Sequence, residues 1–183
     1  MILTLLGCTE FFQQSNRIPI EAKDVDACGL FGYRYLDYYW TEPERHPFLV
    51  KVDEKLAGFV LVNQHTCLHQ DNNAMSIAEF FILKKYRSQG IGKQVATQIF
   101  DQFPGSWEVR QTALNLGAQA FWNKVISQYT NGAFKEVFLN DDRWHGPIKT
   151  FDNSDKVLTE KIHRINRCID SLTKAYTFDD ILH

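Results

Sequence analysis

Several features that mark whole classes of protein are missing from this sequence of 183 residues. There is no basic excess, since the formal net charge is −2 at pH 7, and a dedicated nucleic-acid-binding protein usually carries one. No apolar run is long enough to cross a membrane as a helix. The four cysteines form no Cys-x-x-Cys pair and have no histidine at metal-ligand spacing, which predicts free thiols. We therefore expect a soluble, cytoplasmic protein without nucleic-acid, membrane or metal partners.

What the chain does contain is enough apolar material for one substantial core. It is 44% hydrophobic and 14% aromatic, which at this length predicts one main domain. Period-two apolar stretches predict strands, and helical spacing predicts helices that begin near residues 93 and 115. Strands are expected within 1–8 and at 47–52, 56–62, 74–83, 106–110, 134–139 and 148–151. Strands that alternate with helices in this way indicate an α/β sheet. The region 9–45 shows only a modest helix at 11–15 and an aromatic segment at 31–40.

The most informative stretch is the turn at residues 87–92, Arg-Ser-Gln-Gly-Ile-Gly. It follows an apolar strand and opens a helix, so backbone N–H groups and the positive end of the helix dipole point at one spot. That arrangement binds phosphate, and glycine lets an anion approach the backbone closely. Four cations surround the turn: Lys84, Lys85, Arg87 and Lys93.

Three kinds of phosphate-binding turn are separated by their spacing. A P-loop has four residues between its glycines and then Gly-Lys-Ser/Thr, whereas here the glycines are two apart and Gln94 follows Lys93. A dinucleotide-binding turn needs a third glycine where this chain has Val95, and it lies in the first strand–helix turn. The pattern that remains is R/Q-x-x-G-x-G, the pyrophosphate loop of the GNAT acyl-CoA N-acyltransferases, which residues 87–92 resemble at every position.

A second motif strengthens this resemblance. The chain reads Asn115-x-x-Ala118-x-x-Phe121-Trp122-x-Lys124, and GNAT proteins carry N-x-x-A-x-x-(L/F)-Y-x-K at this distance, where the helix after the fifth strand begins. Asparagine also suits a helix N-cap. The resemblance covers about residues 46–152.

The resemblance implies a GNAT fold: a mixed central sheet flanked by helices on both faces in a domain of residues 1–152, with residues 153–183 as a C-terminal helical extension. It implies acetyl-CoA as cosubstrate, with its pyrophosphate on the glycine turn. Its pantetheine arm would bind backbone groups at the end of the fourth strand, where the fourth and fifth strands of GNAT proteins splay apart. The residues expected to bind the cosubstrate are Ile82, Leu83, Arg87, Gln89, Gly90, Ile91, Gly92, Lys93, Asn115 and Trp122.

Acetyl transfer also needs a base for the amine and a proton for the leaving thiol. Glu79 is the one acid on the central strand, and its aromatic neighbours Phe80 and Phe81 suit a carboxylate with a raised pKa, so we predict it as the base. The alternative is an exposed or lysine-paired glutamate. Many GNAT members place a tyrosine where this chain has Trp122, and an indole supplies no acid. Water or Tyr129 would then protonate the thiol, whose pKa of about 8.5 makes it a fair leaving group.

The predicted activity is transfer of an acetyl group to a primary amine of a small molecule or protein, by direct attack in a ternary complex. The residues show no activated cysteine or serine for a covalent intermediate. One alternative is a CoA-binding regulatory or assembly module without catalysis, which the Trp122 replacement motivates. Nucleotide binding at the turn is a weaker alternative, because no serine or threonine follows Lys93.

The C-terminal residues carry one apolar stripe on an otherwise charged helix. Its members are spaced 4-3-4-3-4 along the chain: Leu158, Ile162, Ile165, Ile169, Leu172 and Tyr176. The stripe would dock either on its own domain or on a second subunit, and we predict a homodimer contact through this helix.

Overall fold

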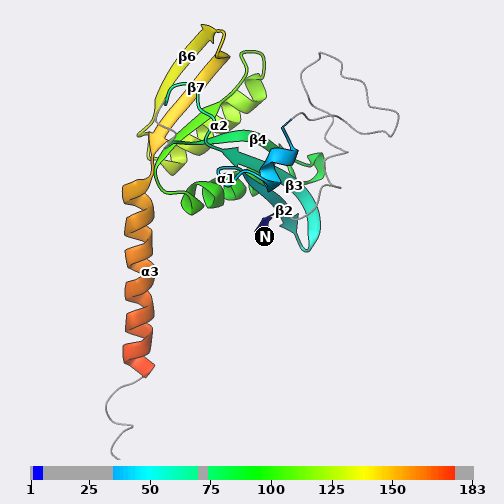
Figure 1. Cartoon of the computed structure of the whole chain (residues 1–183). Coiled ribbons are helices and arrows are strands. Elements are labelled where there is room, and N and C mark those ends of the chain that lie inside the picture. The colour runs from blue at the N-terminus through cyan, green and yellow to red at the C-terminus, as the bar shows by residue number, and fades with distance from the viewer. Residues whose placement is uncertain (1, 6–34, 70–73, 176–183) are drawn as a thin grey trace, which may run out of the picture.

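The computed structural model describes residues 2–5, 35–69 and 74–175 of the chain (Figure 1). The helix predicted at 11–15 and the stripe residue Tyr176 lie outside these residues. Seven strands form one sheet in the order β1-β2-β3-β4-β5-β7-β6. The strands are β1 (Ile2–Leu5), β2 (His46–Val52), β3 (Lys55–Asn63), β4 (Ala74–Ile82), β5 (Ser106–Arg110), β6 (Lys135–Asp141) and β7 (Trp144–Asp152). The helices are the 3-10 segments η2 (Asp37–Trp40) and η3 (Lys84–Tyr86), and α1 (Ile91–Gln102), α2 (Leu116–Tyr129) and α3 (Ser154–Ala175).

Two tight hairpins connect neighbouring strands. Asp53 and Glu54 join β2 to β3 with φ values of 49° and 60°, the left-handed pair that a two-residue hairpin turn requires. The hairpin of β6 and β7 is longer than predicted, because pairing continues to Asp141 opposite Trp144. The expected loop at 140–147 is therefore mostly strand. The Asp141 carboxylate accepts a hydrogen bond from the Arg143 N–H at 2.9 Å, which stabilises the turn.

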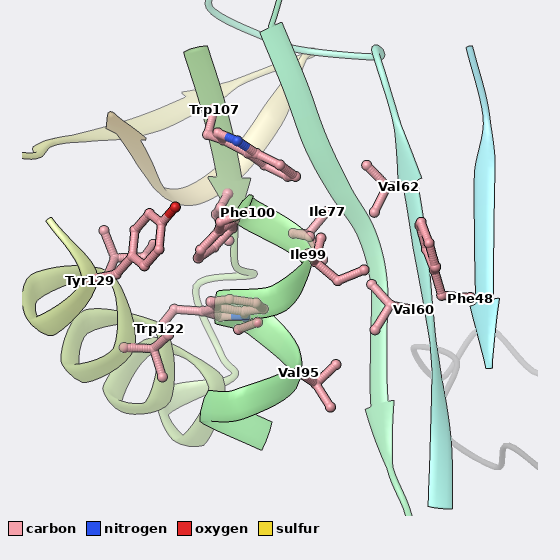
Figure 2. Packing of buried hydrophobic residues seen from close by; sticks show 14 of the residues in the cluster. Phe48, Val60, Val62, Ile77, Val95, Ile99, Phe100, Trp107, Trp122 and Tyr129 are labelled. Carbon is pink, nitrogen blue, oxygen red and sulfur yellow. The ribbon is translucent and has the colours of Figure 1, made fainter. Parts of the chain in front are cut away.

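The helices cover the sheet on both faces, which confirms the predicted α/β fold. Helices α1 and α2 share one face, where their side chains and the inward residues of β3 and β4 form the main core (Figure 2). Its central members include Val60, Val62, Ile77, Val95, Ile99, Phe100, Trp122 and Tyr129. On the opposite face, η2 packs Tyr39 against Phe59 and Leu61 of β3. The alternation of β3 side chains between the two clusters follows from the two-residue period of a strand.

Strand β4 contains a bulge at Ala78. Leu61 of β3 pairs with Glu79, but the next residue, Val62, pairs with Ile77, so one residue of β4 is skipped. Such an extra residue changes which face the later side chains take. Before the bulge Ile77 joins the core of α1 and α2, and after it Phe80 and Ile82 do so.

Strands β4 and β5 separate soon after they meet. They run parallel and pair only through Ala74–Ser76 with Ser106–Glu108. Beyond that point β4 pairs with β3 alone and β5 with β7 alone. We call this divergence, between residues 77–82 of β4 and 109–110 of β5, the wedge. It opens toward the end of the sheet at which β4 leads into the glycine turn.

Helix α3 leaves the sheet after β7 and projects away from it (Figure 1). The stripe side chains of Leu158, Ile162, Ile165 and Ile169 are 49–58% exposed. The described part of the chain therefore does not show the stripe docked on its own domain. None of the helices in the described residues is long and apolar enough to cross a membrane.

Candidate functional site

The glycine turn presents open backbone at the start of α1. Ser88 and Gly90 have φ values of 61° and 77°, and Gly90 is the N-cap residue without any side-chain cap. The first helical hydrogen bond runs from Gln94 N–H to the Gly90 carbonyl at 3.1 Å. The N–H groups of Ile91, Gly92 and Lys93 therefore have no acceptor within the helix. A Cβ atom at Gly90 would meet nothing within 4 Å, so no described side chain crowds the backbone at Gly90.

The side chains of the turn brace it. Arg87 Nε donates to the Ile82 carbonyl at 2.7 Å, and its guanidinium lies 5.7 Å from the Phe81 ring centroid. Gln89 Nε2 donates to the Lys85 carbonyl at 2.8 Å. Lys84, Lys85 and Lys93 are exposed. The turn thus combines a braced backbone with exposed cations at its rim, and the sequence alone did not reveal the bracing contacts.

At the end of β4, the backbone groups of Ile82 point toward the wedge, and the backbone N–H of Leu83 points toward β3. The Leu83 N–H donates to the Ala57 carbonyl of β3 at 2.8 Å, so this group, which the sequence predicted for the pantetheine arm, is already bonded. Backbone groups of an antiparallel strand alternate in direction. Those of Ile82 therefore point away from β3, toward the wedge, and the contact of its carbonyl with Arg87 agrees with that direction.

Aromatic side chains line the region between the turn and the wedge. A Cβ at Gly92 would lie 3.1 Å from the Phe121 ring and 3.8 Å from Phe80, so glycine permits the close approach of α2. Trp122 is 5% exposed and meets Phe80 and Phe121 edge to face, at centroid distances of 5.0 and 4.9 Å. Trp122 is thus part of the core directly beneath Phe80, and a contact of its indole with the cosubstrate stays a prediction.

Asn115 has the predicted place at the start of α2. Its side-chain oxygen accepts from the Ala118 N–H at 3.1 Å, so it is the N-cap. The cap residue and Gly90 mark the beginnings of the two helices that follow β5 and β4. A contact between Asn115 and the cosubstrate stays a prediction.

Glu79 lies on the other face of the sheet from α1 and α2. It is half-buried, directly after the bulge, and its charge contributes to raising the pKa of Tyr39. Burial is the main cause of that raised pKa; the hydrogen bond from Asn63 Nδ2 to the Tyr39 hydroxyl, at 3.0 Å, and the nearby Arg45 oppose it. The predicted base therefore lies on the face of the sheet opposite the one that α1 and α2 cover.

A buried polar row next to Glu79 was missed by the sequence analysis. Asn63, Ser76 and Glu108 lie on adjacent strands and are at most 5% exposed. The Glu108 carboxylate accepts from the N–H groups of Cys67 and Leu68 at 2.6 and 2.9 Å. These bonds hold the loop after β3 across this face. Strand alternation places Glu108 on the face opposite the core residues Trp107 and Val109, so no local pattern indicated that it is buried.

Tyr129 lies at the opposite end of α1 from the glycine turn. Its hydroxyl donates to Asp101 Oδ1 at 2.7 Å and accepts from Asn153 Nδ2 at 3.1 Å. Burial is the main cause that raises the pKa of this hydroxyl. Ten residues of helix separate Ile91 from Asp101, which is about 15 Å. The structure does not bring Tyr129 to the predicted thioester site, and we assign it a structural role at this end of α1.

Within the described residues no group of histidine, cysteine, aspartate and glutamate side chains could hold a metal ion. The candidate site consists of a helix start whose first amides have no acceptor within the helix, the edge of β4 that pairs with no strand beyond Ser76, and a carboxylate on the opposite face of the sheet.

A model of the acetyltransferase (GNAT) family matches residues 9–126. The chain belongs to the acetyltransferase (GNAT) family. The match spans well over half of the sequence and includes β4, the glycine turn, α1 and most of α2. Among curated proteins, none matches this sequence.

Solved structures similar to this chain have the same fold. One is a spermidine N-acetyltransferase chimera from Vibrio cholerae and hSSAT, with a TM-score of 0.54, 14% identity, and coverage of 85% of this chain and 98% of that chain. Another is a GNAT-family acetyltransferase from Staphylococcus aureus Mu50, with a TM-score of 0.51, 14% identity, and coverage of 82% and 99%. An acetyltransferase from Thermus thermophilus has a TM-score of 0.51 and 16% identity, with 65% and 71% covered.

Proposed function

We propose that the chain is an N-acetyltransferase that transfers the acetyl group of acetyl-CoA to a primary amine. The observation that carries this proposal is a shared location: the free first-turn amides of α1 and the unpaired edge of β4 meet at one end of the sheet. Acetyl-CoA has a pyrophosphate group, which free amides can bind, and an extended pantetheine arm, which can bond to a strand edge. Its binding therefore requires both features close together. Membership of the acetyltransferase family supports the same reaction.

In this proposal the backbone of the turn binds the pyrophosphate. The N–H groups of Ile91, Gly92 and Lys93 donate to its oxygens, helped by the positive end of the helix dipole. The exposed lysines at the rim attract the phosphates from solution. The Ile82 backbone bonds the pantetheine arm, and Asn115 and Trp122 flank it from α2.

The acceptor approaches from the Glu79 side of β4. A lysine-type amine has a pKa of about 10.4 and must lose a proton before it attacks. Glu79 takes that proton directly or through one water molecule. The amine nitrogen then bonds to the thioester carbonyl carbon, a backbone N–H at the wedge stabilises the developing oxyanion, and the C–S bond breaks. The nitrogen then loses a second proton, which passes through water to the departing thiolate, so the products are an amide and the thiol of coenzyme A.

Three further predictions belong to this proposal. The acceptor is the primary amine of a small molecule or a protein, as the name of the spermidine N-acetyltransferase neighbour illustrates for a small polyamine. Residues 1–152 form the acetyltransferase domain and residues 153–183 its extension, in a cytoplasmic protein. A second copy of the chain is a partner through α3.

Thermal unfolding with and without acetyl-CoA tests the binding site. We expect the wild type to gain several degrees from acetyl-CoA and the Gly90→Glu variant to gain nothing, because the new carboxylate occupies the open space in front of the amides. Gly132→Glu is the matched control: Gly132 has a φ of 83°, and a Cβ there also meets nothing within 4 Å, but it lies after α2. This variant should keep the full gain. An unshifted wild type at millimolar acetyl-CoA would contradict the proposal.

Thiol release across a panel of amines separates the enzyme from a module that only binds CoA. Trp122, buried among aromatic rings where many family members carry a tyrosine, is the observation that favours the binding module. Stabilisation by acetyl-CoA without thiol release from any amine would support the module. Better stabilisation by ATP or NAD would instead support a nucleotide site.

A further inference from the structure

Helix α3 has an apolar stripe that its own domain leaves open to solvent. It spans 22 residues, about 33 Å at 1.5 Å per residue. Leu158, Ile162 and Ile165 are 58%, 49% and 58% exposed. A helix with so little tertiary packing gains little stability from its sequence alone, because most helical stability in proteins comes from packing an amphipathic face.

The stripe from Leu158 to Leu172 can be written as two heptads. Its apolar positions recur in alternating steps of four and three residues, and the apolar positions of such a repeat meet those of a second helix in a left-handed coiled coil. In heptad terms Ile162 and Ile169 occupy a positions, and Leu158, Ile165 and Leu172 occupy d positions. Isoleucine at a with mostly leucine at d favours two parallel strands.

The positions beside the stripe carry almost no charge. The e and g positions are Thr159, Lys161, Asn166, Cys168 and Thr173. Two copies of α3 therefore meet without facing like charges across the seam. The charged residues lie on the outer face of the helix: Glu160, Arg164, Arg167 and Asp170.

The first turn of α3 is anchored to the domain by the face opposite the stripe. Val157 is 4% exposed, and Lys156 Nζ lies 3.2 Å from the Tyr129 carbonyl and from its ring centroid. At 100° per residue, this pair and the stripe point about 160° apart around the helix. The domain therefore lies on one side of the first turn of α3, and the stripe side chains Leu158, Ile162 and Ile165 are exposed on the other side.

We propose that two copies of this chain dimerise through a parallel, two-stranded coiled coil of their α3 helices. The two domains lie on the outer sides of the helix pair, at its N-terminal end. The proposed dimer contact is separate from the proposed acetyl-CoA site. Helix α3 joins the domain at the end of α1 that carries Asp101, and the glycine turn is at the other end of α1. Dimerisation and acetyl-CoA binding are thus independent measurements.

The full chain tests the dimer by light scattering or sedimentation over a wide range of concentrations. We expect twice the 21.3 kDa of one chain, with a monomer appearing on dilution. Ile165→Lys should weaken the dimer by about a hundredfold or more, because a lysine ammonium at a d position must lose water. Ser171→Lys, which adds the same charge at an exposed c position, should remain dimeric. Both variants should keep the thermal gain from acetyl-CoA.

Disulfide trapping tests the orientation of the helices. In a Cys168→Ser background, Leu158→Cys should form an oxidised dimer, since a parallel pair brings the two residues face to face. A bond requires Cα atoms within about 7 Å. An antiparallel pair that seats residue 158 against residue 169 of the other copy separates the two 158 positions by about 16 Å. Arg167→Cys, on the outer face, is the control that should remain uncrosslinked.

Three results would overturn the proposal. A wild type that is monomeric at every concentration would show that no second copy covers the stripe. A dimer that Ile165→Lys leaves intact would show that another surface dimerises. A dimer that Leu158→Cys fails to trap would exclude the parallel arrangement.

Discussion

The two ends of α1 differ in how their polar groups are satisfied. At the N-terminal end Gly90 caps the helix without a side chain, and the first-turn amides face open space. At the C-terminal end the Asn153 side chain, 2% exposed, accepts from the Gly105 N–H and donates to the Phe100 carbonyl and the Tyr129 hydroxyl. One end has amides without an acceptor in the described part of the chain, and the other has a closed network.

The difference in hydrogen bonding indicates that the N-terminal end of α1 suits ligand binding and that the C-terminal end stabilises the fold. Buried polar groups in proteins almost always have partners within the protein, and the Asn153 network follows that rule. Exposed amides arranged around a glycine have the opposite property, because an outside ligand is needed to complete them. Substitutions at the closed end should therefore change stability, and substitutions at the open end should change ligand binding.

The largest effect is expected at Asn153. Asn153→Ala removes three hydrogen bonds and deprives the Gly105 N–H of its acceptor, while the Phe100 carbonyl keeps only the bond from the Phe103 N–H. The free energy of unfolding should therefore fall by about 3 kcal/mol. Asn166→Ala, on the exposed part of α3, should change it by less than about 0.5 kcal/mol. Urea unfolding measures both. Equal effects in the two variants would show that the network is not what holds this end together.

A smaller loss of stability is expected from Tyr129→Phe. The variant deprives Asp101 and Asn153 of one shared hydroxyl, which should cost about 1–2 kcal/mol. Its turnover with acetyl-CoA should equal that of the wild type, because the hydroxyl lies far from the glycine turn. The decisive comparison is Tm against kcat for the same protein. A lower kcat at unchanged Tm would restore Tyr129 as an acid.

Gly92→Ala should affect binding more than stability. Alanine favours the helix by up to about 1 kcal/mol, but its Cβ would lie 3.1 Å from Phe121, and the two effects oppose each other. The displaced Phe121 ring and the new methyl group narrow the space at the turn. The Kd for acetyl-CoA should therefore rise about tenfold, which weakens the binding free energy by about 1.4 kcal/mol. Calorimetric titration measures this. Ala96→Gly, buried in the same helix, should show the reverse: lower stability and unchanged affinity.

The smallest effect is a pH dependence at the closed end. His46 packs on Phe103 at a centroid distance of 4.7 Å, and burial lowers its pKa despite the opposing charge of Glu44. The unfolded chain therefore takes up a proton near pH 6.5, before the folded one does, so stability should fall as the pH drops below that value. Thermal scans from pH 8 to 5 should show a flatter curve for His46→Gln. His163→Gln, on the exposed face of α3, should leave the curve unchanged.

The sequence predicted the features that depend on short spacing. The strand at 106–110, the hairpin at 53–55 and the helix start at Asn115 all appear where expected. Local rules of turn chemistry and apolar alternation are sufficient for such features. The family motifs likewise lie within single strand–helix units.

The sequence did not predict features that depend on the register between distant segments. Whether Ile82 or Leu83 faces the wedge is decided by the pairing of β4 with β3 across the bulge at Ala78, and nothing local to 74–83 states it. The place of Tyr129 depends on Asp101 and Asn153, which are 28 and 24 residues away in the chain. The helical spacing of residues 115–129 predicted that Tyr129 is buried, but it did not indicate which end of α1 the side chain packs on.

The wedge also limits the backbone pairing between the two halves of the sheet. Within the described sheet, only three residue pairs, Ala74–Ser76 with Ser106–Glu108, connect the strands β1 to β4 with the strands β5 to β7. All pairings within each half are antiparallel, and the two halves have no backbone pairing at the end where β4 and β5 diverge. We expect a molecule that binds along the unpaired edge of β4 to bridge the two halves and to make the sheet stiffer across its width.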